Sequence, residues 1–463
     1  MRLEVAKYLL VDIGSTYTKL TAVDLEKEDI IATSKHFTTV QTDVRIGYNN
    51  ALNLLYEKIG KIEFEKIYAC SSAAGGLKMA AIGLVEELTV EAAKRVCLNA
   101  GGKVDLIFSN KLTKSEVEKI KSSGIDIVLL AGGTDGGNSE CVLYNAKMLG
   151  EAKVEVPIIY AGNKSVQDEI KEIFTEYDLD GHICENVMPR LNELKIDSSR
   201  DKIKNIFLDN IIEAKGINKL ATEIDGLLHP TPQAVLKAAE LLSIGHVNEE
   251  GLGDIILVDI GGATTDIYSF SKGLPTNPNT VLRGLEEPFS KRTVEGDLGM
   301  RYSASGILSS LTLKQKSMFQ DLGIEIEKEI QLRQDNIELV PKTEAEIEIE
   351  NHLANICCDV AFSRHVGTIH SVYTPLGLMH YQEGKDLSNV KTVIGTGGVV
   401  VHSNDARKIL KGIITNPEKP IELRPKEANY YLDNDYILSA MGLLSKDHPD
   451  VALKIMKKRI KRI

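Results

Sequence analysis

Two segments of the chain share a pattern that is typical of phosphate binding. Residues 9–20 read LLVDIGSTYTKL and residues 256–267 read ILVDIGGATTDI, so in each an apolar run ends in Asp and turns through Gly into a second run. Such a turn leaves backbone N–H groups pointing outward, where they can bind phosphate oxygens. Asp12 and Asp259 would then face the metal ion that accompanies phosphate, since Mg²⁺ binds through one or two carboxylates together with phosphate oxygens and waters.

The two turns supply the candidate phosphate ligands. We expect contacts from Gly14, Ser15, Thr16 and Thr18 in the first segment and from Gly261, Gly262, Thr264 and Thr265 in the second. Lys19 either reaches the phosphates or points to solvent, because side chains alternate along a strand. Asp12 and Asp259 are the candidate catalytic residues, because they hold the metal or orient the attacking water. Asp266 is expected to stabilise its own hairpin.

A third glycine-rich segment lies near the C-terminus. Residues 391–401 read KTVIGTGGVVV, an apolar strand followed by a turn. Because Gly397 and Gly398 have no Cβ, an adenine or ribose could approach the backbone closely there. The order of two phosphate turns and a Gly-Gly turn resembles the superfamily of acetate and sugar kinases, heat-shock chaperones and actin. The alternative is that all three are hairpin or strand–helix turns without a ligand.

Size and composition limit the classes of protein that remain. The chain has 463 residues, which indicates two or more domains. Its net charge of −11 argues against nucleic acid as the main partner. We find no run of about 18 apolar residues, so we expect no transmembrane helix. The N-terminus enters the first strand directly, which leaves no room for a signal peptide and predicts a cytoplasmic protein. The six cysteines form no C-x-x-C pair and are expected to be reduced and buried.

The strand and helix patterns divide the chain into four parts. Residues 1–74 are rich in strands and carry the first phosphate turn. In residues 75–190 strands and helices alternate at short spacing, which is typical of a doubly wound parallel sheet, so we interpret this part as an inserted domain. Residues 191–252 are expected to be a helical connection, and residues 253–463 carry the second phosphate turn and the Gly-Gly turn.

Several polar groups outside the turns have two interpretations. Glu295 and Asp297 either assist the metal or, as we slightly favour, cap a helix expected over 294–312. His365 and His370 are five residues apart in a helix expected over 344–371, so they do not share a face and we expect no metal site there. In the inserted part, LLAGGTDGGNSE at 129–140 is either a ligand or partner site at a helix N-terminus or a tight strand–helix turn.

Five sequence segments together resemble one protein family. DIGSTYTKL, SSAAGGLKM at 71–79, LLAGGTDGGN at 129–138, DIGGATTDI and GTGGVVV resemble the glutamate mutase (methylaspartate mutase) accessory proteins of the MutL family, over nearly the whole chain. The resemblance implies an α/β, actin-like ATPase fold of two related, ribonuclease H-like half-domains, interrupted by the inserted doubly wound domain. It also carries the family's phosphate and adenosine motifs onto Asp12–Thr18, Asp259–Thr265 and Gly395–Gly398.

The same resemblance implies a function. It predicts an ATPase that uses ATP and Mg²⁺ to reactivate an adenosylcobalamin-dependent mutase by exchanging damaged cobalamin for intact cofactor. ATPases of this type often act as dimers, so a homodimer is one expectation, although no interface can be recognised in the sequence. Three alternatives stay open: a small-molecule kinase of the same superfamily, an electron-donating dehydratase activator with an iron–sulfur cluster, and an actin-type filament protein.

Overall fold

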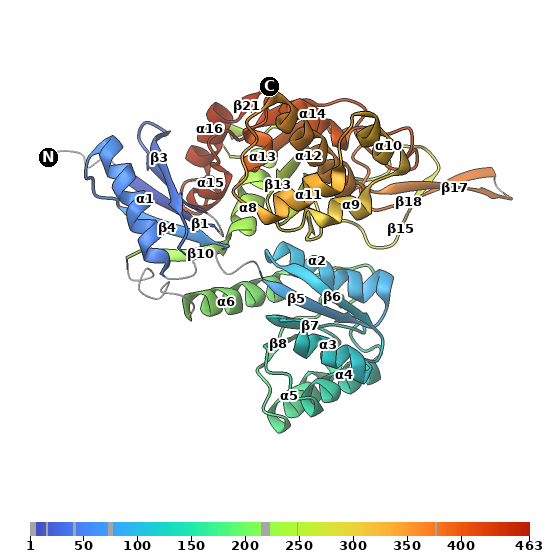
Figure 1. The fold of residues 1–463 in the computed structure, drawn as a ribbon. Helices are drawn as coiled ribbons and strands as arrows, with labels where there is room; N and C mark the ends of the chain where they lie inside the picture. Colours follow the sequence, from blue (N-terminus) through green and yellow to red (C-terminus); the bar gives the residue numbers. More distant parts are fainter. Residues whose placement is uncertain are drawn as a thin grey trace. The chain divides into compact units, whose positions relative to one another are not determined.

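The computed structural model shows a chain built from two compact units (Figure 1). It describes residues 6–14, 17–39, 43–72, 77–213, 223–247, 249–375 and 377–463. The first unit comprises residues 1–235 and 442–447, and the second comprises residues 236–441 and 448–463. No helix in the described ranges combines the length and the apolar character that crossing a membrane requires.

The first unit contains a five-stranded sheet that carries the first of the two predicted phosphate turns. Its strands are β1 (Lys7–Ile13), β2 (Tyr17–Asp24), β3 (Asp29–Phe37), β4 (Lys66–Ser71) and β10 (Gly226–Pro230), in the order β10-β4-β1-β2-β3. The first three strands are antiparallel, whereas β4 runs parallel to β1 and β10 runs parallel to β4. Helix α1 (Val44–Ile59) packs against β2 and β3. Helix and sheet approach closely at Gly47, where a Cβ would lie 2.5 Å from the carbonyl oxygen of Phe37.

The second unit contains a sheet that repeats this arrangement. Its strands are β13 (Ile255–Ile260), β14 (Thr265–Phe270), β16 (Ser290–Glu295), β19 (Thr392–Thr396), β20 (Asn429–Leu432) and the short β21 (Lys461–Arg462), in the order β16-β14-β13-β19-β20-β21. Again the first three strands are antiparallel, and the fourth and fifth run parallel to the first. Both sheets therefore have the order third, second, first, fourth, fifth, which confirms the predicted fold of two related half-domains.

Helices cover the sheet of the second unit. They are α9 (Ser305–Ser310), α10 (Leu313–Asp321), α11 (Ile326–Asp335), α12 (Glu344–His365), α13 (Gly398–Val401), α14 (Ala406–Leu410) and α16 (Pro449–Arg459), with the 3₁₀ turn η3 (Lys411–Ile413). Helices α8 (Thr231–Ile244) and α15 (Leu438–Leu444) each begin in one unit and end in the other. The longest, α12, buries Leu353, Ile356 and Phe362 in the main core of this unit. A separate three-stranded sheet combines β15 (Thr280–Arg283), β18 (Gly377–Glu383) and β17 (Thr368–Thr374).

A second sheet of the first unit is the inserted doubly wound domain that the sequence predicted. Strands β5 (Lys78–Gly83), β6 (Lys103–Ser109), β7 (Ile127–Leu130), β8 (Ile158–Tyr160) and β9 (Gly181–Ile183) are all parallel, in the order β6-β5-β7-β8-β9. The connecting helices are α2 (Glu91–Asn99), α3 (Lys114–Ser122), α4 (Glu140–Glu151) and α5 (Gln167–Glu176). The strand order reverses between β5 and β7, as in flavodoxin-like sheets. Every residue of β7 and β8 is buried, which is typical of a sheet covered on both faces.

Strand β10 was not anticipated. The segment between the inserted domain and α8 was expected to be helical, and helix α6 (Asp197–Glu213) is present, but β10 adds a fifth strand beside β4. Five residues that end in Pro230 are too few for a period to be recognised, and a proline is tolerated at the end of an edge strand. This strand depends on pairing with β4, which local sequence does not encode.

Two expected helices are wrong in part. The helix expected over 294–312 is replaced by β16, which ends at Glu295, and by the short α9. The helix expected over 344–371 ends at His365, and the chain turns through Gly367 into β17. In both places β-branched residues follow one another and favour a strand. His370 consequently lies on β17 and not on the helix that carries His365.

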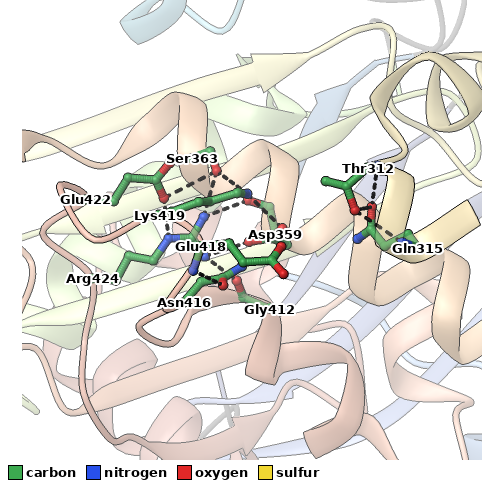
Figure 2. A network of polar contacts seen from close by, with 10 residues as sticks. All are labelled: Thr312, Gln315, Asp359, Ser363, Gly412, Asn416, Glu418, Lys419, Glu422 and Arg424. Atoms are coloured by element: carbon green, nitrogen blue, oxygen red, sulfur yellow. Dashed lines mark hydrogen bonds and ion pairs between the residues drawn. The ribbon is translucent and has the colours of Figure 1, made fainter. Parts of the chain in front are cut away.

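A buried network of ions attaches α12 to the segment before β20 (Figure 2). The Arg424 side chain is fully buried, and its Nη1 lies 2.8 Å from Oδ1 of Asp359 while also donating to the carbonyl oxygen of Gly412 at 2.6 Å. Its Nη2 donates to Ser363 Oγ at 2.7 Å, and Lys419 donates to the other carboxylate oxygen of Asp359 at 2.8 Å. The guanidinium also lies 5.3 Å from the ring centroid of Phe362. Because every charge in the network has a partner, its burial is tolerated.

The six cysteines are free and buried, as expected. Burial raises the pKa of the Cys357 thiol to about 12, and it also raises the pKa of Cys358 on the same helix. These thiols therefore stay protonated and unreactive near neutral pH.

Replacing Arg424 should destabilise the second unit. In Arg424→Met the carboxylates of Asp359 and Glu422 lose the guanidinium while remaining largely buried, and breaking a buried pair in this way costs about 3–5 kcal/mol. The measurement is urea unfolding followed by circular dichroism. Lys314→Met is the control, because Lys314 is 81% exposed and its ion pair with Glu418 contributes at most about 1 kcal/mol. Equal shifts in the two variants would contradict this account.

Candidate functional site

The first predicted carboxylate, Asp12, lies at the end of β1. It is 7% exposed and accepts a hydrogen bond from Thr231 Oγ1 at 2.8 Å. Thr231 is the first residue of α8, directly after β10, and Cys70 Sγ on β4 lies 3.6 Å from the same carboxylate oxygen. The carboxylate is thus oriented by the two strands that run parallel to β1. The role of Thr231 could not be predicted from the sequence, because it lies 219 residues after Asp12 and only the strand order places it beside that carboxylate.

The first turn has a tight and specific geometry. The N–H of Gly14 donates to the carbonyl oxygen of Tyr17 at 3.0 Å, and a Cβ at Gly14 would lie 2.7 Å from that oxygen. Ser15 and Thr16, predicted to contact phosphate, lie outside the described residues. Thr18 is fully buried and shares a hydrogen bond of 2.9 Å with Thr38, so its hydroxyl supports the sheet.

Lys19 is the polar residue nearest to Asp12 in the sheet register. It is half-buried on β2 and lies directly opposite Asp12 on β1. Side chains of directly opposed residues in an antiparallel pair lie on the same face of the sheet. The register therefore places Lys19 on the same face of the sheet as Asp12, which is the face it must occupy if it is to reach the phosphates.

The second turn repeats the first. Asp259 is half-buried on β13, and the N–H of Gly261 donates to the carbonyl oxygen of Thr264 at 2.9 Å. This bond joins the residues two and five positions after the aspartate, as does the bond between Gly14 and Tyr17 in the first turn. The two turns therefore have the same hydrogen bond at the same distance from their aspartates.

The segment after β16 holds the second turn in place. The N–H of Met300 donates to the carbonyl oxygen of Gly261 at 3.0 Å, and the N–H of Arg301 donates to that of Gly262 at 2.8 Å. Arg301 is fixed in turn by Glu350, whose Oε1 lies 2.8 Å from its Nη2. This support could not be predicted from residue types, because it is made by backbone groups.

Glu295 and Asp297 do not cap a helix. Nη1 of Arg364, on α12, lies 2.7 Å from both Glu295 Oε2 and Asp297 Oδ1, and the nearest helix after them, α9, begins only at Ser305. The helix-cap interpretation is therefore wrong, because the segment leaves β16 through a turn. The two carboxylates flank one guanidinium, which raises the pKa of Arg364 well above its usual value.

The threonines of the second turn differ in their surroundings. Thr265 is fully buried on β14, whereas Thr264 is half-buried and donates to Asp266 Oδ2 at 3.0 Å. Asp266 also accepts from Arg292 on β16, at 2.9 Å from Nε and 2.7 Å from Nη2. Asp266 thus stabilises its own hairpin, as expected, and holds Thr264 at the turn.

The Gly-Gly turn lies against Asp259. Strand β19 pairs in parallel with β13, which places Thr396 opposite Asp259. The next residue, Gly397, has φ of 89°, and a Cβ there would lie 2.4 Å from the carbonyl oxygen of Ile260 and 2.7 Å from Asp259 Oδ1. At Gly398 a Cβ would have no atom within 4 Å, so this position opens to free space. Gly395 instead faces the core, where Val400 and Leu410 would meet its Cβ.

Two further polar residues lie at the same end of the sheet. Asp433 follows β20 and accepts from the N–H groups of Ile437 at 2.9 Å and Leu438 at 3.3 Å, which caps α15. Tyr436 has φ of 54°, and its pKa is raised by burial and by the charges of Asp433 and Asp259. Neither residue belongs to a recognisable motif, so neither could be predicted from the sequence.

The glycine-rich loop of the inserted domain has an internal explanation. Gly133 has φ of 72°, and a Cβ there would lie 2.1 Å from the carbonyl oxygen of Asn138. The buried Asn163 accepts from the N–H of Gly136 at 3.0 Å, and Asn186 donates to the carbonyl oxygen of Gly133 at 3.0 Å. These contacts favour the tight-turn interpretation of the loop over a ligand site.

In the described part of the chain, three or more His, Cys, Asp or Glu side chains nowhere gather as a metal-binding group. Each turn offers a single carboxylate, Asp12 in the first unit and Asp259 in the second, and Mg²⁺ held by one carboxylate takes its remaining ligands from phosphate and water.

Several solved structures are similar to this chain at low TM-scores. They include the ethanolamine utilization protein EutJ from Carboxydothermus hydrogenoformans, at 12% identity and a TM-score of 0.27 over 98% of this chain and 91% of that one. They also include a gluconate kinase from Lactobacillus acidophilus, at 10% identity and a TM-score of 0.35 over 99% and 92% of the two chains. The fold assignment rests on the repeated strand order and not on these similarities.

The sequence comparisons are more specific. The family model described as MutL protein matches residues 8–460. Protein MutL from Clostridium tetanomorphum is 53% identical over 459 residues, which covers 98% of this chain and 99% of that protein. The chain therefore belongs to the MutL protein family.

Proposed function

We propose that this chain is an ATP-dependent reactivating factor for an adenosylcobalamin-dependent mutase, with glutamate mutase as the first candidate. The observation that carries the proposal is that the same strand, aspartate and glycine turn occur twice in the chain. Each of two sheets with the same strand order has an aspartate as the next-to-last residue of its first strand, and a glycine turn closed by the same hydrogen bond follows that strand.

Nucleotide phosphates fit these turns. The glycines leave backbone close to the surface of each turn, and Asp12 and Asp259 offer oxygen ligands suited to Mg²⁺. The Thr18 hydroxyl is buried and bonded to Thr38, and Thr265 is fully buried, so we assign the phosphate contacts to the turn backbone and the remaining Ser and Thr groups. Bound Mg²⁺ would neutralise charge on the phosphates, while Asp12, oriented by Thr231, holds or orients a water.

The nucleoside fits the Gly-Gly turn. Gly397 contacts the end of β13, and Gly398 beside it borders open space. Tyr436 and His402 lie next to the same strand ends, with ring centroids 6.0 Å apart. A flat adenine could therefore approach the backbone at Gly398 in the sheet that also carries Asp259.

Reactivation requires that the factor prefer one state of the mutase over another. A ligand shifts an equilibrium only by its differential affinity for the two states. ATP and ADP differ by the outer phosphate that the turns would bind, so nucleotide state can change the affinity for the mutase. We assign mutase docking to the inserted domain, residues 75–190, which has its own sheet and core.

Removal of either strand-end carboxylate should abolish ATP turnover. We expect Asp12→Ala and Asp259→Ala each to lower the rate of Mg²⁺-dependent ATP hydrolysis by roughly 100-fold or more, because each loses a carboxylate that holds the charge-neutralising Mg²⁺ or orients the attacking water. Asp168→Ala is the matched control, since the Asp168 side chain is 90% exposed on α5. Full activity in both test variants would remove the basis of the ATPase assignment. Nucleotide binding without any effect on a mutase would instead favour a small-molecule kinase.

Gly398→Ala should separate nucleotide binding from folding. The added methyl group meets no protein atom and alanine favours a helix, so the melting temperature of the free protein should stay the same or rise. ATP affinity, measured by calorimetry, should fall about tenfold, equivalent to about 1.4 kcal/mol. An unchanged ATP affinity would place the nucleoside elsewhere. Gly397→Ala provides the contrast, because its Cβ collides with Ile260 and should lower the melting temperature.

Deletion of residues 75–190 tests the docking assignment. Retained ATP hydrolysis in the shortened protein would show that the nucleotide-binding halves still fold, and we expect recovery of inactivated mutase to be lost. Unchanged recovery would exclude the inserted domain as the docking surface.

A further inference from the structure

The hairpin of β17 and β18 extends away from the helices of the second unit as a two-stranded arm (Figure 1). Strand β15 pairs only with the base of β18, from His380 to Glu383. Beyond that base Val372 is 45% exposed, Tyr373 is 86% exposed and Leu378 is 42% exposed. An isolated two-stranded hairpin is at best marginally stable in water, so an apolar arm of this kind is suited to completion by a partner.

The arm carries no charge. The sequence contains no Asp, Glu, Lys or Arg between Arg364 and Glu383, although charged residues make up 26% of the chain. Exposed edge strands usually carry charges, especially lysine, that prevent pairing with another chain, and this one does not. Two copies of a chain with a net charge of −11 repel each other, and an uncharged arm allows them to meet without like charges in opposition.

The outer edge of β17 has backbone groups in position for pairing. In the described sheet β15-β18-β17, β17 is the last strand. The N–H of Ile369 points outward and donates to the carbonyl oxygen of Ile421 at 2.8 Å, so the base of the edge is covered. Backbone groups alternate between the two sides of a strand in an antiparallel ladder. The next outward-facing residues are therefore Ser371 and Tyr373.

We propose that two copies of this chain form a reversible dimer by antiparallel pairing of their β17 edges about a two-fold axis at Val372. In this register Ser371 of one copy lies opposite Tyr373 of the other. The two residues form a hydrogen-bonded pair, in which the N–H of each donates to the carbonyl oxygen of the other. An axis at Ser371 would instead require Ile369, which is already bonded to Ile421. Pairing through two outward-facing residues of each copy is a small contact beside the ~800 Å² per partner of a standard stable interface, so we expect a weak dimer that forms only at high protein concentration.

The register is tested by cross-linking. In the dimer the two copies of residue 372 form a non-hydrogen-bonded pair with Cα atoms about 4.5 Å apart, within the range of a disulfide. Val372→Cys should therefore form a disulfide-linked dimer under mild oxidation. The six native cysteines are buried, so they should not contribute to the cross-linking. Leu378→Cys is the matched control, with similar exposure in the parent chain. Its two copies would lie three strand spacings apart, about 14 Å, and should not be linked.

The interface itself is tested by sedimentation velocity over a range of protein concentrations. Wild type should show a monomer–dimer equilibrium, and Val372→Lys should raise the dissociation constant at least about tenfold because two lysines oppose each other. Val247→Lys, at a position 87% exposed elsewhere in this unit, should leave the equilibrium unchanged. A wild-type monomer at every concentration, or equal linking of both cysteine variants, would overturn the proposal. If wild type is monomeric and Val372→Lys abolishes mutase reactivation, the arm binds the mutase and not a second copy, which also overturns the proposal.

Discussion

The candidate site depends above all on the parallel pairing of the first strand of each sheet with the fourth. In the second unit this pairing places Thr396 opposite Asp259, so that Gly397 contacts a carboxylate 138 positions earlier in the chain. In the first unit the same pairing places Cys70 beside Asp12, and the fifth strand then delivers Thr231. Carboxyl ends of parallel strands meet at one edge of a sheet, which is why polar groups from distant segments gather there.

Supports outside the turns make this arrangement rigid. In the second unit the backbone of Met300 and Arg301 bonds to the turn after β13, and Arg301 is fixed by Glu350 on α12. The same helix is attached by Arg424 to the segment that precedes β20. A fully buried arginine with several partners has few alternative positions, because moving it would leave buried charges unpaired. The second turn can therefore stay in a fixed geometry without a ligand, and preorganisation of this kind lowers the entropic cost of binding.

The parts of this molecule that local patterns encode were predictable. The repeated DIG phrases, the alternation of strands and helices in the inserted domain and the burial of the cysteines follow from short-range periodicity and composition, and each agrees with the structure. Residues supplied by strand order were not predictable. Thr231, Asp433 and Tyr436 belong to no motif, and β10 is a strand only because β4 lies beside it. Glu295 and Asp297 were misinterpreted because their partner, Arg364, is 67 or more residues away.

The central claim is that nucleotide state drives recovery of a damaged mutase. The most direct measurement is the activity of glutamate mutase that has been inactivated with its cobalamin in place, followed after addition of this chain with free adenosylcobalamin and either ATP or a non-hydrolysable analogue. The account predicts that activity returns with ATP and Mg²⁺ and does not return in repeated turnovers with the analogue. Equal recovery with ATP, with the analogue and without nucleotide would contradict it.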